Sequence, residues 1–363
     1  MKKHITAVMF LLTILLFAKV NVFASEITLG LDKAIEMAKK DNPQLISADV
    51  KIQDAQRQLD EAKKDQRNTK GAIRLPEMFS LVAVKKGYYV EQAKIGLQLA
   101  KTERQKAENN ISYEVTQKYY SLKLSEELLK SARDTYNLTV QNKNAVDKQY
   151  EVGLVSALDV QSASYAVNQS KAMVSKYERN MDIARKSLLV SLQIDDENTN
   201  PVLTDGIEYE EFTADVKADI KKAMENRMDI YSLKANSEQA KRYLDITMVL
   251  GYKSSEYSAA KQSLSQAEYN YKNTMKLMGI SINSFYNDIL NAKDSVLLAE
   301  ENLLLKQKEY ETSEAQYSIG MITNSQLLSV LSSVTNAKIE LENAKLTYKL
   351  AVKKYGYEIT IGL

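Results

Sequence analysis

The chain contains one twelve-residue pattern twice, and this repetition limits the folds open to it. Residues 149–160 read QYEVGLVSALDV, and residues 316–327 read QYSIGMITNSQL, 167 positions further along. The segment from Ala34 likewise matches the segment from Asp219, at a shift of 185. Such self-similarity is typical of one supersecondary unit that is built twice. We therefore predict two structural repeats, residues 25–200 and 201–363, and look for the function in what they form together.

The first 24 residues have the composition of an export signal. Two lysines precede the apolar run Ile5–Ala18, and Val22-Phe23-Ala24 is a small-residue cleavage site. An uncleaved membrane anchor is the alternative, but the run is short for a membrane span. Removing residues 1–24 with their three lysines lowers the formal charge from +2 to −1. We expect an exported protein of the cell envelope without a basic surface for nucleic acid.

The residue types of the mature chain exclude most catalytic sites. There is no cysteine, and the only histidine, His4, lies in the predicted signal. Zinc sites of thiolate or imidazole ligands and Ser-His or Cys-His catalytic pairs are therefore excluded. Carboxylate-only or Ser-Lys chemistry stays open, but no GxSxG, phosphate-binding loop or calcium loop is present. We expect no enzyme, and no catalytic, cofactor-binding or metal-binding residues.

Long helices are predicted by the scarcity of helix breakers, with 11 glycines and 3 prolines in 363 residues. From Glu91 to Tyr150 there is no proline and one glycine. Apolar residues recur there at threes, fours and a seven, which is the pattern of a coiled coil: Ile111, Val115, Tyr119, Leu122, Leu129, Ala132, Tyr136 and Val140. Sixty helical residues span about 90 Å, so this helix must pack along its length.

Shorter elements are expected around these helices. Ile27–Leu29 could be a strand, and a helix from Leu31 is interrupted at Asp41-Asn42-Pro43. Asp195–Asp215 reads as a polar connector with short strands or turns. The 22 tyrosines against 6 phenylalanines suit helices that are wet on one side. Compositional drift is the alternative reading of that tyrosine content.

The repeated pattern marks the reversal of each helical hairpin. Gly153 and Gly320 supply a residue that tolerates positive φ. The neighbouring apolar residues are not needed for a turn, and exposed apolar residues at paired tips suggest a docking surface. The alternative is that they clamp the two helices of each hairpin together. These residues are Val152, Leu154 and Val155 in the first copy and Ile319, Met321 and Ile322 in the second.

The chain resembles the outer-membrane efflux protein (TolC) family. The resemblance is carried by the opening ITLGLDKAIEMAKKDNPQL, by the two-fold repeat and by YEVGLVSALDVQSASYAV at the first tip. It implies a homotrimer in which twelve helices form a hollow tube, an α-barrel, across the periplasm. It also implies tips that contact a periplasmic adaptor (membrane fusion) protein, itself coupled to an inner-membrane transporter.

The resemblance assigns roles to residues at both tips. The adaptor-contacting positions correspond to Val152, Gly153 and Leu154, and by repeat to Ile319, Gly320 and Met321. The possible pore entrance comprises Asp159, Tyr317, Gln326 and Ser329. The family often has aspartates where this chain has Gln326 and Ser329, so an acidic ring is not expected. Tyr317 is a bulky residue that could close the tip or simply pack between helices.

A second departure from the family lies at the other end of each hairpin. Each half of a family member carries two membrane-spanning strands of about 9–11 residues. Residues 66–90 are just long enough but lack apolar–polar alternation, and residues 246–254 are too short for two strands. Three copies would then supply fewer strands than a transmembrane barrel needs. We therefore expect a reduced or missing β-barrel.

These observations predict an all-α dominated fold of long antiparallel coiled-coil hairpins in two tandem repeats, with short strands in connectors. As a trimer it would form a twelve-helix α-barrel with little or no transmembrane β-barrel. The function predicted is that of a channel in a tripartite efflux or type I secretion system. A non-conducting coiled-coil scaffold or binding protein of the envelope is the alternative.

Overall fold

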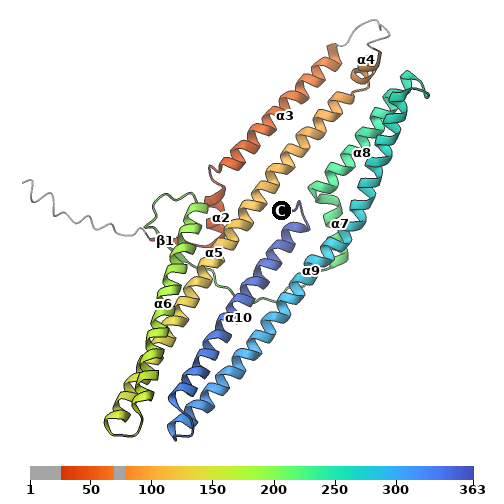
Figure 1. Cartoon of the computed structure of the whole chain (residues 1–363). Helices are drawn as coiled ribbons and strands as arrows, with labels where there is room; N and C mark the ends of the chain where they lie inside the picture. Colours follow the sequence, from red (N-terminus) through yellow and green to blue (C-terminus); the bar gives the residue numbers. More distant parts are fainter. Residues whose placement is uncertain (1–25, 69–77) are drawn as a thin grey trace, which may run out of the picture.

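The computed structural model describes residues 26–68 and 78–363, and it consists mainly of long paired helices (Figure 1). The predicted export signal lies outside the described residues. The elements in chain order are β1 (Glu26–Leu29), α2 (Leu31–Lys39), α3 (Pro43–Asn68), α4 (Met78–Lys85), α5 (Tyr88–Glu151), α6 (Ala157–Ser191), β2 (Asn200–Leu203), α7 (Val216–Asn226), α8 (Met228–Thr247), the 3₁₀ turn η2 (Met248–Leu250), α9 (Ser255–Ser318) and α10 (Asn324–Glu358).

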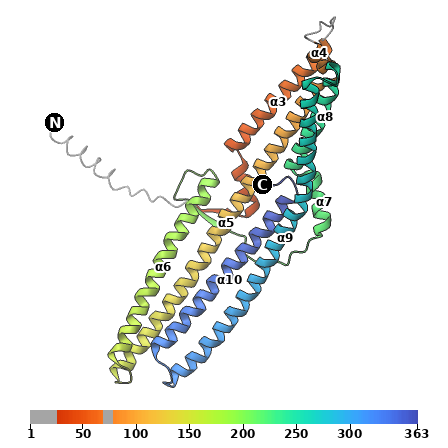
Figure 2. The same ribbon diagram turned by 45° about the vertical axis from the view of Figure 1, so that its right-hand side comes forward.

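The internal repeat extends to the lengths of the main helices. Helices α5 and α9 have 64 residues each, and α6 and α10 have 35 each. Each long helix therefore pairs with a shorter one in an antiparallel hairpin of the same size (Figures 1 and 2). A rise of 1.5 Å per residue makes α5 and α9 about 95 Å long. The predicted fold of long coiled-coil hairpins is confirmed.

The first helix of each half is broken at the corresponding position. Asp41 has a φ of 53°, and Pro43 follows as the first residue of α3, where its missing N–H is not needed. The Asn42 side chain accepts a hydrogen bond from the Gln44 backbone N–H at 2.9 Å. In the second half the break between α7 and α8 falls at Arg227, 185 positions after Asn42.

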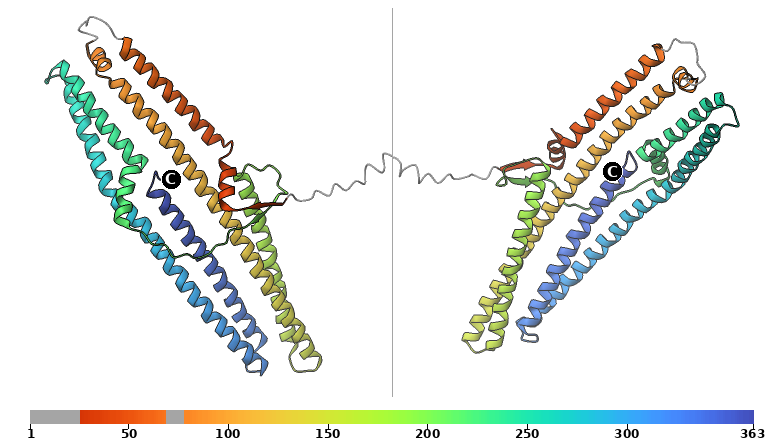
Figure 3. Two further views of the ribbon diagram at one scale, coloured as in Figure 1. Left: turned by 180° about the vertical axis from the view of Figure 1, so that it is seen from behind. Right: turned by 45° about the horizontal axis from the view of Figure 1, so that its top comes forward.

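Two short helices continue the lines of α6 and α10, so the molecule is four helices wide in both its lower and its upper half. The Gln193 side chain, after the end of α6, donates to the Ala38 and Lys40 carbonyls at 3.4 and 3.3 Å. These carbonyls lie just before the start of α3, so α3 continues the line of α6. The Arg227 guanidinium binds the Glu358 carboxylate, so α8 continues the line of α10. The lower half therefore has the order α6, α5, α10, α9, and the upper half has α3, α5, α8, α9 (Figure 3).

The connector between the two halves crosses the middle of the molecule and is held there by hydrogen bonds from tyrosine hydroxyls. Strands β1 and β2 pair in parallel, with Leu29 opposite Leu203. The buried Tyr119 hydroxyl donates to the Leu29 carbonyl at 2.9 Å and accepts from the Asp205 N–H at 3.0 Å. The buried Tyr348 hydroxyl makes the same pair of bonds with the backbone of residues 210 and 212. These hydroxyls bind the protein backbone, so the reading of tyrosine as a water-facing residue was wrong for them.

Strands within the described residues are confined to β1 and β2, which have four residues each. The predicted short strands in connectors are thus confirmed. The described part of 66–90 holds the end of α3, α4 and the start of α5, and 246–254 holds the end of α8, η2 and a turn. In the part of the chain that the structure describes, no helix has both the length and the apolar character to cross a membrane.

Candidate functional site

The two tips, which we define as residues 152–156 and 319–323, have the same backbone geometry. Gly153 and Gly320 have φ values of 75° and 77°, as the repeated pattern predicted. Each glycine N–H donates to the carbonyl three residues before it, and the next N–H donates to the carbonyl five residues before it. This arrangement is a Schellman motif, which satisfies the last carbonyls of α5 and α9. Glycine is required here by its φ, since no atom crowds either position.

The return helix of each hairpin begins with a capping box. The Ser156 N–H donates to the Asp159 carboxylate at 2.9 Å, and the Asp159 N–H donates to the Ser156 hydroxyl at 3.3 Å. Thr323 and Gln326 make the equivalent pair of bonds at 2.8 and 3.3 Å. Each pair satisfies backbone groups that a helix start leaves unbonded. Glycine, hydroxyl residue and cap partner thus form one turn module that occurs twice.

The apolar residues of the tips project into solvent. Val152, Leu154, Ile319 and Met321 are 69%, 74%, 71% and 70% exposed. A clamp between the two helices of a hairpin would be buried, so the clamp interpretation does not fit these four residues. Val155 and Ile322 are partly buried. Turn formation uses the glycines and capping boxes, which leaves the four exposed side chains free for another role.

Two candidates for the pore entrance are engaged in the caps. The Asp159 carboxylate is bound by the Ser156 hydroxyl and N–H, and these hydrogen bonds hold its pKa below the ordinary value. The Gln326 side-chain oxygen has the same task in the second tip. The structure therefore gives both residues a local role in helix capping. Whether they also line an entrance remains a prediction.

Tyr317 joins the two hairpins near their tips. Its hydroxyl donates to the Gln149 side-chain oxygen at 3.2 Å, from α9 to the end of α5. Burial raises the pKa of Tyr317, and the nearby Asp159 carboxylate raises it further. Tyr317 and Asp159 are therefore close together, whereas Gln326 and Ser329 lie along α10. Gln149 was missed by the sequence analysis, although the repeated Gln-Tyr at 149 and 316 is a signal that could have indicated it.

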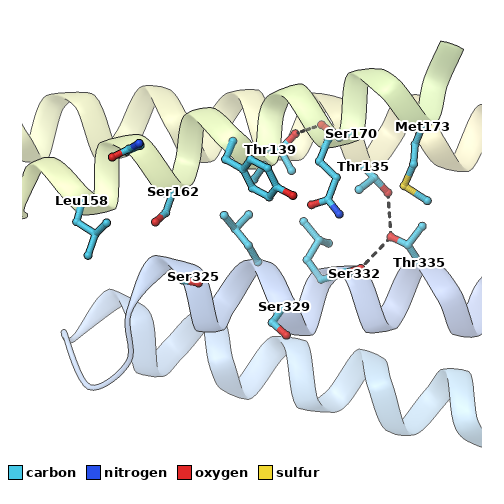
Figure 4. Close-up of a pocket in the computed structure, with 16 residues that line it drawn as sticks. Thr135, Thr139, Leu158, Ser162, Ser170, Met173, Ser325, Ser329, Ser332 and Thr335 are labelled. Atoms are coloured by element: carbon cyan, nitrogen blue, oxygen red, sulfur yellow. Dashed lines mark hydrogen bonds between the residues drawn. The ribbon is translucent and has the colours of Figure 1, made fainter.

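An uncharged groove runs between the hairpins just above the tips, with a volume of about 600 Å³ (Figure 4). Its walls are α6 and α10 and its floor is α5, where Thr135 meets Thr335 of α10 at 3.0 Å. Ser329 lines this groove. The lining residues are mostly serines, threonines, glutamines and apolar side chains, and none of them is charged. Such an uncharged surface can be wet and can pack a helix.

The first tip should respond to pH where the second does not. The pKa of Asp159 is lowered in the folded chain, so its cap is present above the unfolded value of about 4. The cap is lost as the pH falls through the lower folded pKa. We expect amide exchange in the first turn of α6 to accelerate about fivefold at that point, given a cap of about 1 kcal/mol.

The measurement is hydrogen exchange followed by mass spectrometry, corrected for the intrinsic pH dependence of exchange. The first turn of α10 is the internal control, because Gln326 does not titrate. Asp159→Gln should make the two tips behave alike. Equal acid responses of the two tips in the unaltered chain would contradict this assignment.

Comparison with known proteins identifies the class of fold. No family model matches the sequence, and no curated protein sequence matches it. Solved structures do match, over about nine-tenths of the chain. The chain has the fold of the TolC-family outer-membrane channels, and the resemblance predicted from the repeat and the tip pattern is confirmed at the level of fold.

Three of these solved structures show the extent of the likeness. The CusC channel protein has 13% sequence identity and a TM-score of 0.73, with 93% of this chain and 94% of that one covered. VceC, an outer-membrane protein of Vibrio cholerae, has 14% identity and a TM-score of 0.71, with 92% and 96% covered. The MtrE outer-membrane channel of Neisseria gonorrhoeae has 15% sequence identity and a TM-score of 0.66, with 92% of this chain and 89% of that one covered. At such identities the likeness establishes the fold alone.

Proposed function

We propose that this chain is the exported channel subunit of a tripartite efflux or type I secretion system. Three copies form a duct that passes small molecules or polypeptides across the cell envelope. The subunit makes and breaks no bonds. A periplasmic adaptor binds the tips and couples the duct to an inner-membrane transporter. The channel fold supports this reading, and the edges of the helical layer are the single observation that carries it.

Both edges of the four-helix layer carry apolar side chains without a partner in the chain. On α6, Ile183 and Val190 are 67% and 73% exposed, and their spacing of 7 places them on one helix face. On α9, at the opposite edge, Leu298 and Leu305 are 66% and 54% exposed and also share a face. Two such apolar edges favour contact between copies of the chain.

The two edges differ, so the contact that joins them is heterologous and repeats around a ring. Helices α6 and α9 run in opposite directions, which suits an antiparallel pair like those within the protomer. Twelve helices spaced about 10 Å apart would form a ring about 40 Å across, with a lumen of about 30 Å. The number of three copies comes from the family resemblance. A lumen of that width would admit hydrated small molecules and extended polypeptides.

The experiment that tests this function measures the oligomeric state of the protein and its conductance across a lipid bilayer. We expect the mature protein to be a trimer by light scattering, with a continuous lumen by electron microscopy. We expect conductance across a lipid bilayer when the adaptor is present. Stable trimers without a lumen or conductance would support the non-conducting scaffold instead. A monomer would contradict both functions.

A further inference from the structure

The two walls of the uncharged groove are the same helix face in the two copies of the repeat. Leu158 and Ser162 of α6 lie 167 positions before Ser325 and Ser329 of α10, which is the shift of the repeated pattern. All four residues line the groove, the first two on one wall and the last two on the other (Figure 4). The internal repeat therefore brings its own equivalent faces together across this groove.

The two walls differ in the size of their side chains. The α10 wall carries Ser325, Ser329 and Ser332. Tyr165 of α6 corresponds to Ser332 by the repeat, lines the opposite wall and is 69% exposed. Small side chains would let two helices approach closely, yet α6 and α10 enclose about 600 Å³. That volume is typical of a pocket for one small molecule, roughly 300–1,000 Å³.

A buried amide without a partner continues the α10 wall toward the tips. Asn324 lies 4, 7 and 11 positions before Leu328, Leu331 and Thr335, so all four share one face of α10. The last three line the groove. Asn324 is 2% exposed, and neither its side-chain oxygen nor its side-chain nitrogen has a partner among the described residues.

The floor of the groove has the same feature. Asn142 lies 7 and 3 positions after Thr135 and Thr139, which line the groove, so it continues their face of α5 toward the tips. Its buried side-chain oxygen also has no partner among the described residues. Buried polar groups of native proteins are almost always bonded. Two such groups on the lining faces therefore indicate a ligand or a ligand-bound water at the tip side of the groove.

The lining defines the chemistry of that ligand. No charged residue lines the groove, so an ionic group would lose its hydration without a counter-charge. Gln161 and Gln169, one turn on either side of Tyr165, can bond to hydroxyl or amide groups. Leu328 and Met173 provide apolar contact together with the tyrosine ring. A wholly apolar ligand would leave the amides and hydroxyls without partners.

We propose that the groove binds a neutral amphiphilic small molecule, which carries hydroxyl or amide groups on an apolar frame. The apolar part lies against the Tyr165 ring and the leucines. The polar groups bond to the glutamines and, toward the tips, to Asn142 and Asn324. All of these residues belong to one chain, so binding requires neither a lumen nor an adaptor. Only a role in transport rests on the proposed function: a site near the tips would favour uncharged cargo.

The test is binding of octyl glucoside, which joins a neutral sugar to an apolar chain, to protein that begins at Ser25. This protein retains every described element. Titration calorimetry is done below the concentration at which micelles form. Octanoate and octylammonium are the matched probes, because they carry a similar chain with a negative or a positive group. We expect the two charged probes to bind at least about tenfold more weakly than octyl glucoside.

Two variants locate the binding to the groove. Tyr165→Ser should weaken binding of octyl glucoside about tenfold, because the ring contact is lost. Tyr269→Ser on α9, where the tyrosine is 64% exposed and does not line the groove, is its control. Ser329→Lys should reverse the preference, so that octanoate binds more tightly than octyl glucoside. Ser265→Lys at an exposed position of α9 should keep the original preference.

A third variant gives two readouts of opposite sign. Asn324→Leu removes a buried amide that has no partner in the chain, so the protein should unfold at a higher temperature. The same change should weaken binding of octyl glucoside about fivefold, because the ligand loses a hydrogen bond. A purely structural role of Asn324 predicts the first effect without the second. Circular dichroism checks that all variants keep their helices.

Three outcomes would overturn the proposal. Octyl glucoside could fail to bind, or could bind no better than the charged probes. Tyr165→Ser could bind it as well as Tyr269→Ser does. Ser329→Lys could impair recovery of the adaptor while binding of octyl glucoside is unchanged, which would make the groove a seat for a protein helix. Binding by a trimer that does not conduct would instead contradict the proposed function alone.

Discussion

Replacing Ile183 and Val190 of α6 with aspartate is expected to convert the trimer into monomers. Both side chains are about 70% exposed, so the fold of the single chain should be unchanged. In the proposed ring they are buried against α9 of the next copy. Each loses about 2 kcal/mol of burial, and each aspartate would place an unpaired carboxylate in the contact. Together these effects weaken each junction by roughly a thousandfold or more, and a ring needs three junctions.

The same result is expected from the opposite edge. Leu298→Asp with Leu305→Asp on α9 should also give monomers, because the two edges meet each other. A mixture of the two variants gives the sharpest readout. The α6 variant keeps an intact α9 edge, and the α9 variant keeps an intact α6 edge. Each mixed pair can therefore form one junction and no ring, so a heterodimer is expected.

Native mass spectrometry of the separate and mixed variants measures this outcome. Leu154→Asp with Met321→Asp is the control, because it adds the same charge to exposed apolar sites away from both edges. Trimers that survive either edge variant would show that the edges do not join copies. A mixture that forms homodimers only would show that each edge pairs with its own kind.

Local signals allowed much of this fold to be predicted from sequence. The long helix expected from Glu91 to Tyr150 is α5, Tyr88–Glu151, because no breaker interrupts a continuous apolar stripe. The positive φ values of Gly153 and Gly320 follow from the need to reverse the chain. These features depend on neighbours a few residues away. Such neighbours can be read directly from the sequence.

Other features depend on partners that are distant in sequence. The Tyr119 hydroxyl bonds to backbone groups 90 and 86 positions away, and nothing near Tyr119 indicates them. Helix α4 has an apolar composition without a clear period, and its place is set by the packing of Phe79 on Tyr243 of the other half. The uncharged groove requires α6 and α10 to be side by side, which the repeat alone does not specify.

Asp159 shows how a residue can be noticed for an incomplete reason. The family resemblance placed Asp159 at a possible pore entrance, and the structure shows that its carboxylate is bound by Ser156. A hydroxyl residue followed three positions later by an acid or amide is a helix-start signal. Ser156 with Asp159 and Thr323 with Gln326 both fit that signal. Reading the two tips together would have predicted the caps, since the acid is replaced by an amide without loss of the turn.

Leu154→Asp combined with Met321→Asp is expected to abolish binding of the adaptor while trimers remain. Both residues are at least 70% exposed and neither is needed for the turn, so folding should be unaffected. Exposed apolar anchors of this kind contribute about 2 kcal/mol or more when a partner buries them. A trimer presents six such anchors, and their loss is multiplied because the partner binds several tips at once.

The adaptor can be identified and measured in one experiment. A photoreactive residue at position 154 or 321, introduced in the producing cell, should cross-link the adaptor, and the same residue at position 249 should not. Recovery of that adaptor with the double variant should fall at least about tenfold, whereas Val249→Asp with Leu250→Asp should leave it unchanged. If the unaltered protein and both double variants recover the adaptor equally, the apolar side chains of the tips are exposed for another reason. If the tip variant loses both the adaptor and its trimeric state, Leu154 and Met321 would instead be residues of the trimer contact, because the adaptor is expected to bind the intact ring.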